Sequence, residues 1–541
     1  MMQRILFAAA CVTLASAAPR PGPRASRPRL VIVIVVDQFR PDYLQRFRPY
    51  FGTGGFNLFL RRGANFTEAE YKHAVTFTCP GHAVVLTGTY ANVNGIISNQ
   101  WYDSKAGRQE YCAADSSVTL IGSTDPGRSP RNLIGSTVGD ELKRTSRGRS
   151  RVIAMAGKDR SAIMLGGHKA DGAYWTEDSL FVTSTYYMKE LPAWVQQFNA
   201  SGRVSSYAGK SWDRLLPMAA YAGVGPDYVR AEQNVAGMGR TFPHRLAPDT
   251  SPRFLDGFRS SPFQNEVLLD FARAAVTSEK LGEDDDPDLL ALSLSANDLI
   301  GHAFGPNSHE VMDVTVRTDR LLDRFFEFLD RQIGLRQVLI VLTADHGVAP
   351  LPELARDLHP GAVRLDPARI AAAAETALRS RFGVPPGPGW LAHLSPPWLY
   401  LSVEALRQKG IAIEEAERTA RDAVKGVRGV HQALTATELR QQQKDGMASG
   451  ALLSFYPDRS GNIYYELKPF IVPGQGTTGT THGSPWSYDT RVPLLWFGSS
   501  IKRGAYREAT SIADIAPTLS ALLGIDAPAG SRGRVLREML R

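Results

Sequence analysis

The chain is poor in cysteine: its 541 residues include three, Cys11, Cys79 and Cys112. So few thiols exclude a fold held together by a framework of disulfides. A chain of this length can instead bury a substantial hydrophobic core. One bond between Cys79 and Cys112 is compatible with this count, but the sequence does not fix whether their geometry permits it, so their pairing stays open.

Long hydrophobic runs and concentrated charge are also missing. No apolar run reaches the roughly 18 residues that a membrane span needs, so we expect no transmembrane segment. The net charge of +8 comes from arginines spread along the chain. We therefore expect no dedicated nucleic-acid surface, although a mildly positive field would attract anionic substrates.

The N-terminus has the zones of an export signal. Arg4 precedes the apolar stretch ILFAAACVTLASAA, which ends in small residues before PRPGPRASRPR. This order predicts a signal peptide at 1–18, a Pro/Arg-rich leader at 19–28 and a periplasmic or secreted protein. The alternatives are a frayed hydrophobic N-terminus and lipidation at Cys11, although only a very short apolar stretch precedes that cysteine.

Apolar runs that end in polar residues recur along the chain. RLVIVIVVDQF, RVIAMAGKDR, LLALSLSANDLIGH and QVLIVLTADHG each place reactive side chains directly after a β-branched or leucine-rich run. Helical patterns such as HEVMDVTVRTDRLLDRFFEFLDRQIG lie between them, which predicts an α/β fold with a mostly parallel sheet flanked by helices. We expect a catalytic domain at 29–541 with capping insertions at about 170–285 and 355–475.

The side chains at these predicted strand ends suit a metal centre. In α/β sheets, ligands bind beyond the carboxyl ends of the strands. Zinc takes nitrogen and oxygen donors, and this set supplies carboxylates and imidazoles. Each residue alone would more often be a cap or a structural residue, but together they predict a metal site formed by Asp37, Asp298, His302, Asp345, His346 and His482.

The stretch TFTCPGH, residues 76–82, is the candidate nucleophile loop. It reads as a turn that enters a helix with Pro80 in its first turn. A hydroxyl there can be activated by a metal, and the helix dipole favours its anion. The loop offers Thr76, Thr78 and Cys79. A cysteine phosphatase would need an arginine six positions after the cysteine, where this chain has Val85, so that mechanism is excluded.

These motifs resemble the alkaline phosphatase superfamily, in particular its nucleotide pyrophosphatase/phosphodiesterase-like and phosphate-irrepressible alkaline phosphatase branches. The resemblance runs from VIVVDQFRPDYL through TFTCPGHAVVLTGTYANVNGIISNQWYD, GKDRSAI, NDLIGHAFGP, TADHG and TTHGSPWSYDTRVPLLWFG to IADIAPTLSALLGI. It implies that Thr78 is the nucleophile and that two zinc ions bind per chain. One zinc would be held by Asp37, Thr78, Asp345 and His346, and the other by Asp298, His302 and His482.

The resemblance also assigns the residues that bind phosphate. Asn99 matches an asparagine that binds a phosphoryl oxygen, and Lys158 with Arg160 matches the pair typical of monoesterases with a threonine nucleophile. A lysine charge and an arginine fork favour a dianionic monoester over a monoanionic diester. In a departure from the pattern, Asn94 stands where relatives commonly have histidine. His309 lies outside the ligand pattern, and we expect it at a helix start.

The expected activity is therefore that of a secreted alkaline phosphatase. It would hydrolyse small phosphate monoesters at alkaline pH through a zinc-activated Thr78 and a covalent phosphothreonine. His82 would pack in the helix and not bind metal. We expect a monomer. The alternatives are a phosphodiesterase or nucleotide pyrophosphatase with the same metals and, more remotely, a non-catalytic phosphate or glycan binder on this scaffold.

Overall fold

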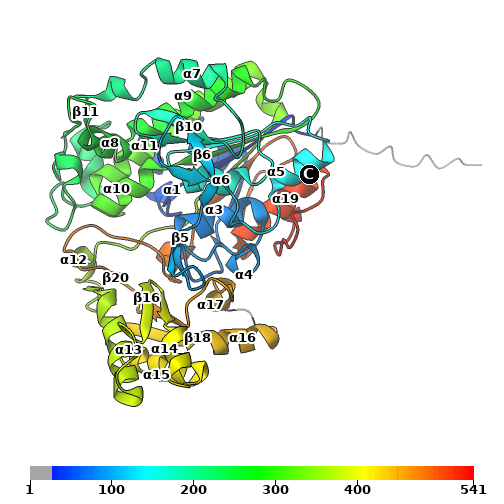
Figure 1. The fold of residues 1–541 in the computed structure, drawn as a ribbon. Coiled ribbons are helices and arrows are strands. Elements are labelled where there is room, and N and C mark those ends of the chain that lie inside the picture. Colours follow the sequence, from blue (N-terminus) through cyan, green and yellow to red (C-terminus); the bar gives the residue numbers. More distant parts are fainter. Residues whose placement is uncertain (1–26, 448) are drawn as a thin grey trace, which may run out of the picture.

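The computed structural model of the chain describes residues 27–447 and 449–541. The expected signal peptide at 1–18 and most of the leader at 19–28 lie outside the described residues. Within them, no helix is both long enough and apolar enough to cross a membrane. The body of the molecule is an α/β unit with a smaller unit beneath it (Figure 1).

An eleven-stranded sheet organises the larger unit. Its central strands run parallel in the order β14 (Val338–Thr343), β1 (Leu30–Val36), β13 (Asp288–Leu294), β8 (Val152–Ala156) and β9 (Gly172–Glu177). Every residue of β1, β13, β8 and β14 is buried, which explains why these strands read as continuous apolar runs. The predicted α/β fold is confirmed.

Both margins of this sheet contain antiparallel pairs, so the whole sheet is mixed. Beyond β14 it continues through β21 (Leu494–Phe497), β2 (Ala64–Phe66) and β22 (Gly504–Tyr506), and beyond β9 through β10 (Leu180–Ser184), β6 (Ala114–Ile121) and β7 (Pro126–Arg128). Most of these strands are short; β9 with β10 and β6 with β7 pair locally, whereas β21, β2 and β22 pair with strands far away along the chain.

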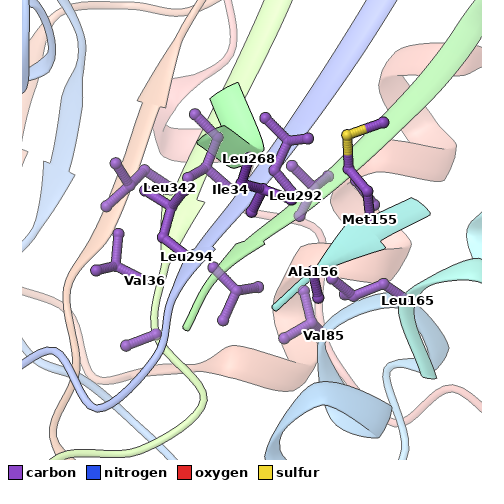
Figure 2. Packing of buried hydrophobic residues seen from close by; sticks show 14 of the residues in the cluster. Ile34, Val36, Val85, Met155, Ala156, Leu165, Leu268, Leu292, Leu294 and Leu342 are labelled. Carbon is purple, nitrogen blue, oxygen red and sulfur yellow. The ribbon is translucent and has the colours of Figure 1, made fainter. Parts of the chain in front are cut away.

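Helices pack on the central strands through apolar side chains. Val85 of α3 (Thr78–Thr87), Leu165 of α6 (Asp159–Gly166) and Leu268 of α9 (Phe263–Ser278) meet strand residues in one core (Figure 2). The other long helices of this unit are α10 (Ala296–Phe304), α11 (His309–Gln332) and α19 (Ile515–Leu523). The core thus fixes the starts of α3 and α6 relative to the strand ends.

Two segments depart from simple strand–helix alternation. Residues 170–285 begin with β9 and β10 of the main sheet and continue through α7 (Ala193–Ala200), α8 (Pro252–Arg259) and α9. Residues 355–475 contain a separate four-stranded sheet, β16 (Leu391–Ser395), β17 (Trp398–Leu401), β19 (Ile463–Leu467) and β18 (Val430–Thr435), covered by α13 (Pro367–Phe382) and α15 (Ile413–Lys425). The division into a catalytic domain with two insertions stays a prediction.

Two buried carboxyl groups lie between the 170–285 segment and α11. Glu310 pairs with His244, whose Nε2 is 2.9 Å from Glu310 Oε1. Glu232 is 1% exposed. Burial and the nearby Glu310 raise the pKa of Glu232 from its ordinary 4.5 to about 9. Glu232 therefore keeps its proton in the folded protein at neutral pH.

We expect the protonation of Glu232 to make stability fall as pH rises. Between pH 4.5 and about 9 the folded chain holds a proton that the unfolded chain has released. The free energy of unfolding therefore decreases by up to about 1.4 kcal/mol per pH unit. Glu232→Gln should remove this dependence, so its melting temperature should change less between pH 6 and pH 9 than that of the wild type. The exposed Glu283→Gln should behave like the wild type; parallel curves for all three proteins would contradict the assignment.

Candidate metal centre and active site

The carboxyl ends of the parallel strands bring the predicted site residues together. Asp37 directly follows β1, Asp345 and His346 follow β14, Lys158 follows β8, and Asp298 lies in the first turn of α10 after β13. Since these strands pair in parallel and in register, their carboxyl ends meet at one edge. Three carboxylates and a lysine thus share one edge of the sheet.

The first predicted ligand set converges on His346. Its Nε2 atom lies 3.2 Å from Asp345 Oδ2, 3.6 Å from Asp37 Oδ1 and 3.4 Å from Thr78 Oγ1. Each of these side chains is at most 1% exposed. The four side chains expected to share one metal ion therefore surround one point.

The second predicted set converges on Asp298. Its Oδ1 atom lies 3.2 Å from His302 Nε2 and 3.6 Å from His482 Nε2. Asp298 and His302 are four residues apart on α10, so both face the same side of the helix. Asp298 also lies within reach of Asp37 and His346, and so it joins the two groups that could each hold a metal ion.

Backbone carbonyls orient all three of these imidazoles. Nδ1 of His302 lies 2.7 Å from the Thr480 carbonyl, Nδ1 of His346 lies 3.0 Å from that of Gly347, and Nδ1 of His482 lies 2.7 Å from that of Thr76. A carbonyl only accepts, so each Nδ1 donates its proton. In the neutral ring, Nε2 is then the unprotonated nitrogen, and it faces the carboxylates as a metal ligand requires.

The buried carboxylates also fit a bound cation. Asp37 Oδ1 and Asp345 Oδ2 are buried and accept no hydrogen bond from any residue that the structure describes. Burial and the neighbouring Asp345 raise the pKa of Asp37 from 3.8 to about 7, although Lys158 acts in the opposite direction. A positive charge among these oxygens offsets both the cost of burying the carboxylates and the repulsion between them. The donor set therefore fits metal ions.

Lys158 joins the two sets. Its Nζ atom lies 2.6 Å from Asp37 Oδ2 and 2.6 Å from Asp298 Oδ2, and its side chain is 10% exposed. Burial alone would raise the pKa of Asp298, but His302 and Lys158 lower it well below its ordinary value. The ammonium group therefore neutralises part of the buried negative charge.

The geometry separates the candidates in the nucleophile loop. Thr78 is the first residue of α3, and its Oγ1 faces His346, whereas the Thr76 hydroxyl donates to the Ser484 carbonyl. His82 has both ring nitrogens engaged, at 2.8 Å from the Thr78 carbonyl and 2.9 Å from Ser293 Oγ. His82 Nδ1 is also 3.2 Å from Asp345 Oδ2, so it supports that carboxylate from inside the helix.

Cys79 and Cys112 form a disulfide, which answers the question that the sequence left open. Asn99 lies beside it, and its side-chain oxygen accepts from the Cys79 amide at 2.8 Å. Arg160 lies in the first turn of α6. Its turn is fixed by Asp159, whose Oδ1 accepts from the Arg160 amide at 2.7 Å and from the Tyr111 hydroxyl at 2.6 Å.

Gln38 is a site residue that the sequence analysis missed. Its Nε2 donates to Asp298 Oδ1 at 2.6 Å and its amide to Asp345 Oδ1 at 3.1 Å, so it contacts both ligand sets. A left-handed backbone, with φ 60°, directs it there. Gly301 leaves room for it, because a Cβ at that position would collide with Gln38 Oε1. In the sequence, only its position directly after Asp37 could have indicated that Gln38 belongs to the site.

Two other polar residues have structural roles. The side chain of Asn94 donates to the Thr89 carbonyl and accepts from the Ile96 amide, so it closes the turn at Gly95. His309 is the first residue of α11, as expected. Neither contributes to the ligand sets.

Carboxylates and imidazoles at the carboxyl edge of a parallel sheet, beside a hydroxyl at a helix N-terminus, are typical of metal-dependent hydrolases of phosphate esters. Comparison with known proteins narrows this class. A family model described as type I phosphodiesterase / nucleotide pyrophosphatase matches residues 31–463.

Curated relatives match nearly the whole chain. Alkaline phosphatase PhoV of Synechococcus elongatus is 35% identical over 526 residues, which cover 95% of this chain and 94% of the relative. Alkaline phosphatase PafA of Elizabethkingia meningoseptica is 33% identical over 525 residues, 95% of either chain. The crystal structure of wild-type PafA aligns with a TM-score of 0.88 and 32% identity, covering 96% of this chain and all 100% of that one.

The chain therefore belongs to the type I phosphodiesterase / nucleotide pyrophosphatase family, within the alkaline phosphatase superfamily. The resemblance inferred from the sequence motifs is confirmed. Members of this family depend on metal ions, in agreement with the ligand groups at the strand ends.

Proposed function

We propose that this protein is an alkaline phosphatase that hydrolyses phosphate monoesters through Thr78. One observation carries the proposal: the Nε2 atoms of three imidazoles and three buried carboxylates converge beside the Thr78 hydroxyl. The relatives PhoV and PafA are named alkaline phosphatases, which supports the same activity.

In the proposed reaction, Thr78 Oγ1 gives up its proton and attacks phosphorus, the bond to the ester oxygen breaks, and that oxygen takes up a proton and leaves as the alcohol. The result is a phosphothreonine at the N-terminus of α3. The dipole of α3 stabilises the negative charge there. Water then attacks the phosphothreonine, which releases inorganic phosphate and restores the Thr78 hydroxyl.

Two zinc ions would complete the site. Asp37, Thr78, Asp345 and His346 would hold one, and Asp298, His302 and His482 the other. Bound zinc supplies Lewis acidity, lowers the pKa of a coordinated hydroxyl and neutralises charge on the transferred phosphoryl group. Gln38 and His82 would keep the carboxylates in position, because each contacts a ligand oxygen.

Lys158, Arg160 and Asn99 would bind the phosphoryl oxygens. A monoester is a dianion with three non-bridging oxygens, whereas a diester has only two and a single negative charge. Two cationic side chains at this side of the site therefore favour the monoester. The family description also covers phosphodiesterases, so diester hydrolysis is the second candidate activity.

We further propose that the protein is exported to the periplasm or secreted, after removal of the N-terminal signal. The Cys79–Cys112 disulfide supports an oxidising compartment, where such bonds persist. The enzyme would act there on small phosphate esters as a monomer.

Kinetics with matched substrates test the activity. With zinc present and at alkaline pH, kcat/KM should be higher for p-nitrophenyl phosphate than for bis-p-nitrophenyl phosphate, since both release the same leaving group. Thr78→Ala should lower monoester turnover by about 1,000-fold or more, while Thr78→Ser, which keeps the hydroxyl, should retain much of it. A diester preference, or full activity of Thr78→Ala, would overturn the proposal.

The charge of the substrate should determine how much the loss of Lys158 and Arg160 lowers kcat/KM. Lys158→Ala with Arg160→Ala should lower monoester kcat/KM by about 100-fold or more, because each side chain removes a charge-assisted contact. The diester should lose about tenfold or less. The exposed Lys189→Ala serves as the control and should leave both values unchanged. Equal losses for the two substrates would exclude a role in monoester selection.

Metal content tests the two ligand sets separately. Elemental mass spectrometry should find about two zinc ions per chain in the wild-type protein. A chelator should abolish activity reversibly. His302→Ala removes a ligand of one set only, so it should retain about one zinc. The exposed His359→Ala should retain both. Two zinc ions in His302→Ala, or none in the wild type, would refute this assignment.

A further inference from the structure

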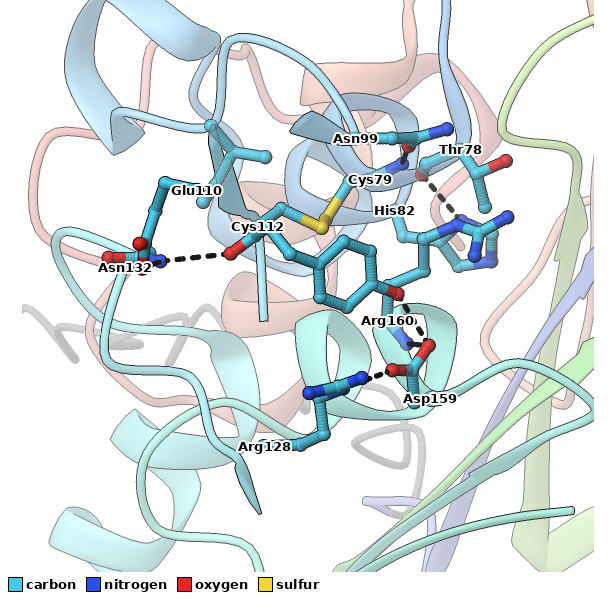
Figure 3. The surroundings of a disulfide bond; sticks show 12 residues. Thr78, Cys79, His82, Asn99, Glu110, Cys112, Arg128, Asn132, Asp159 and Arg160 are labelled. Carbon is cyan, nitrogen blue, oxygen red and sulfur yellow. Dashed lines mark hydrogen bonds and ion pairs between the residues drawn. A yellow bond between two sulfur atoms is a disulfide. The ribbon is translucent and has the colours of Figure 1, made fainter. Parts of the chain in front are cut away.

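The Cys79–Cys112 disulfide lies beside Thr78 and Asn99, at the side of the site where we propose that phosphate binds. Cys79 follows Thr78 in the first turn of α3, and Cys112 directly follows β5 (Arg108–Tyr111). Both cysteines are fully buried. The bond therefore joins the helix that carries the nucleophile to the hairpin of β4 (Gln100–Asp103) and β5 (Figure 3).

Asn99 spans the two bonded cysteines. Its side-chain oxygen accepts from the Cys79 amide at 2.8 Å, and its backbone carbonyl accepts from the Cys112 amide at 3.0 Å. Because the side-chain oxygen is engaged in this way, the amide nitrogen of Asn99 is the group available to donate to a phosphoryl oxygen. The orientation of this donor thus depends on the separation of the two cysteine backbones.

The end of the hairpin, at Tyr111, is also attached to α6 through Asp159. The Tyr111 hydroxyl donates to Asp159 Oδ1 at 2.6 Å, and Arg128 Nε donates to Asp159 Oδ2 at 2.8 Å. Arg128 also lies over the Tyr111 ring, 5.0 Å from its centre. These contacts fix the hairpin to α6, beside Arg160, without involving the disulfide.

We propose that the Cys79–Cys112 disulfide is a positioning element for Asn99 in phosphate binding, and not only a stabilising crosslink. The disulfide is the covalent connection between the hairpin, which is anchored on α6, and the start of α3. Without it, hydrogen bonds alone would hold Asn99 between the two, and its amide nitrogen would sample other directions. Small displacements of a positioned group cost catalytic rate.

This proposal rests on the proposed phosphatase function and adds a specific dependence to it. A crosslink that only stabilises the fold would affect every phosphate-binding residue alike. A crosslink that positions Asn99 should matter only while Asn99 is present. Arg160 provides the matched comparison, because Asp159, its neighbour in α6, accepts from its amide without involving either cysteine.

A double-mutant cycle tests this dependence. The variant with Cys79→Ala and Cys112→Ala is made in the wild type, in Asn99→Ala and in Arg160→Ala. In the wild type, loss of the bond should lower monoester kcat/KM by about tenfold and raise the inhibition constant of inorganic phosphate similarly. In Arg160→Ala the same tenfold loss should recur, whereas in Asn99→Ala it should largely disappear. Zinc content should not change in any variant.

The outcomes are distinguishable. The same loss in Asn99→Ala as in the wild type, or no loss in the wild type, would overturn the positioning role. If the wild-type protein hydrolysed no monoester, the proposed function itself would fail, whereas phosphate binding measured by calorimetry would still test the disulfide. If the cysteine variant did not fold, the cycle would be run on wild-type, Asn99→Ala and Arg160→Ala proteins reduced with a phosphine, with the free thiols counted by alkylation and mass spectrometry.

Discussion

The repulsion among three buried carboxylates is the constraint on which the rest of the site depends. Asp37, Asp298 and Asp345 are at most 3% exposed and lie at the ends of neighbouring strands. Desolvation and mutual repulsion would favour their neutral forms, as the raised pKa of Asp37 indicates. Such a cluster persists as carboxylates only beside compensating charge, so the imidazoles, Lys158 and any cation that binds there belong to one electrostatic arrangement.

The fold meets this constraint by orienting the imidazoles from the backbone. The carbonyls of Thr76, Gly347 and Thr480 each accept from one Nδ1, so every Nε2 is directed inward. These carbonyls belong to loops that are distant in sequence, and the parallel core brings them to one edge. The hydrophobic strands thereby determine the tautomers of the site as well as its shape.

The sequence predicted the centre of this arrangement better than its surroundings. Asp37 and Asp345 could be placed together because each ends a buried β-branched run, and such ends share one edge of a parallel sheet. Gln38 could not be recognised, because its role requires a left-handed backbone and the space beside Gly301. The antiparallel margins escaped prediction for a similar reason: their short strands carry little periodicity, and β2 pairs with a strand more than 400 residues later. The disulfide also depends on a distance that no local pattern encodes.

Lys158 connects the charge of the site to its proposed substrate. Its ammonium lies 2.6 Å from a carboxylate of each ligand set, so it occupies the same electrostatic position that a cation between the sets would favour. A metal ion bound there would therefore compete with Lys158 for the charge of Asp37 and Asp298, and by linkage each would weaken the hold of the other. An ammonium released from carboxylates is available to an incoming anion. In the proposed site, the same buried negative charge that would hold the metal ions would thus also determine whether Lys158 can bind the phosphate.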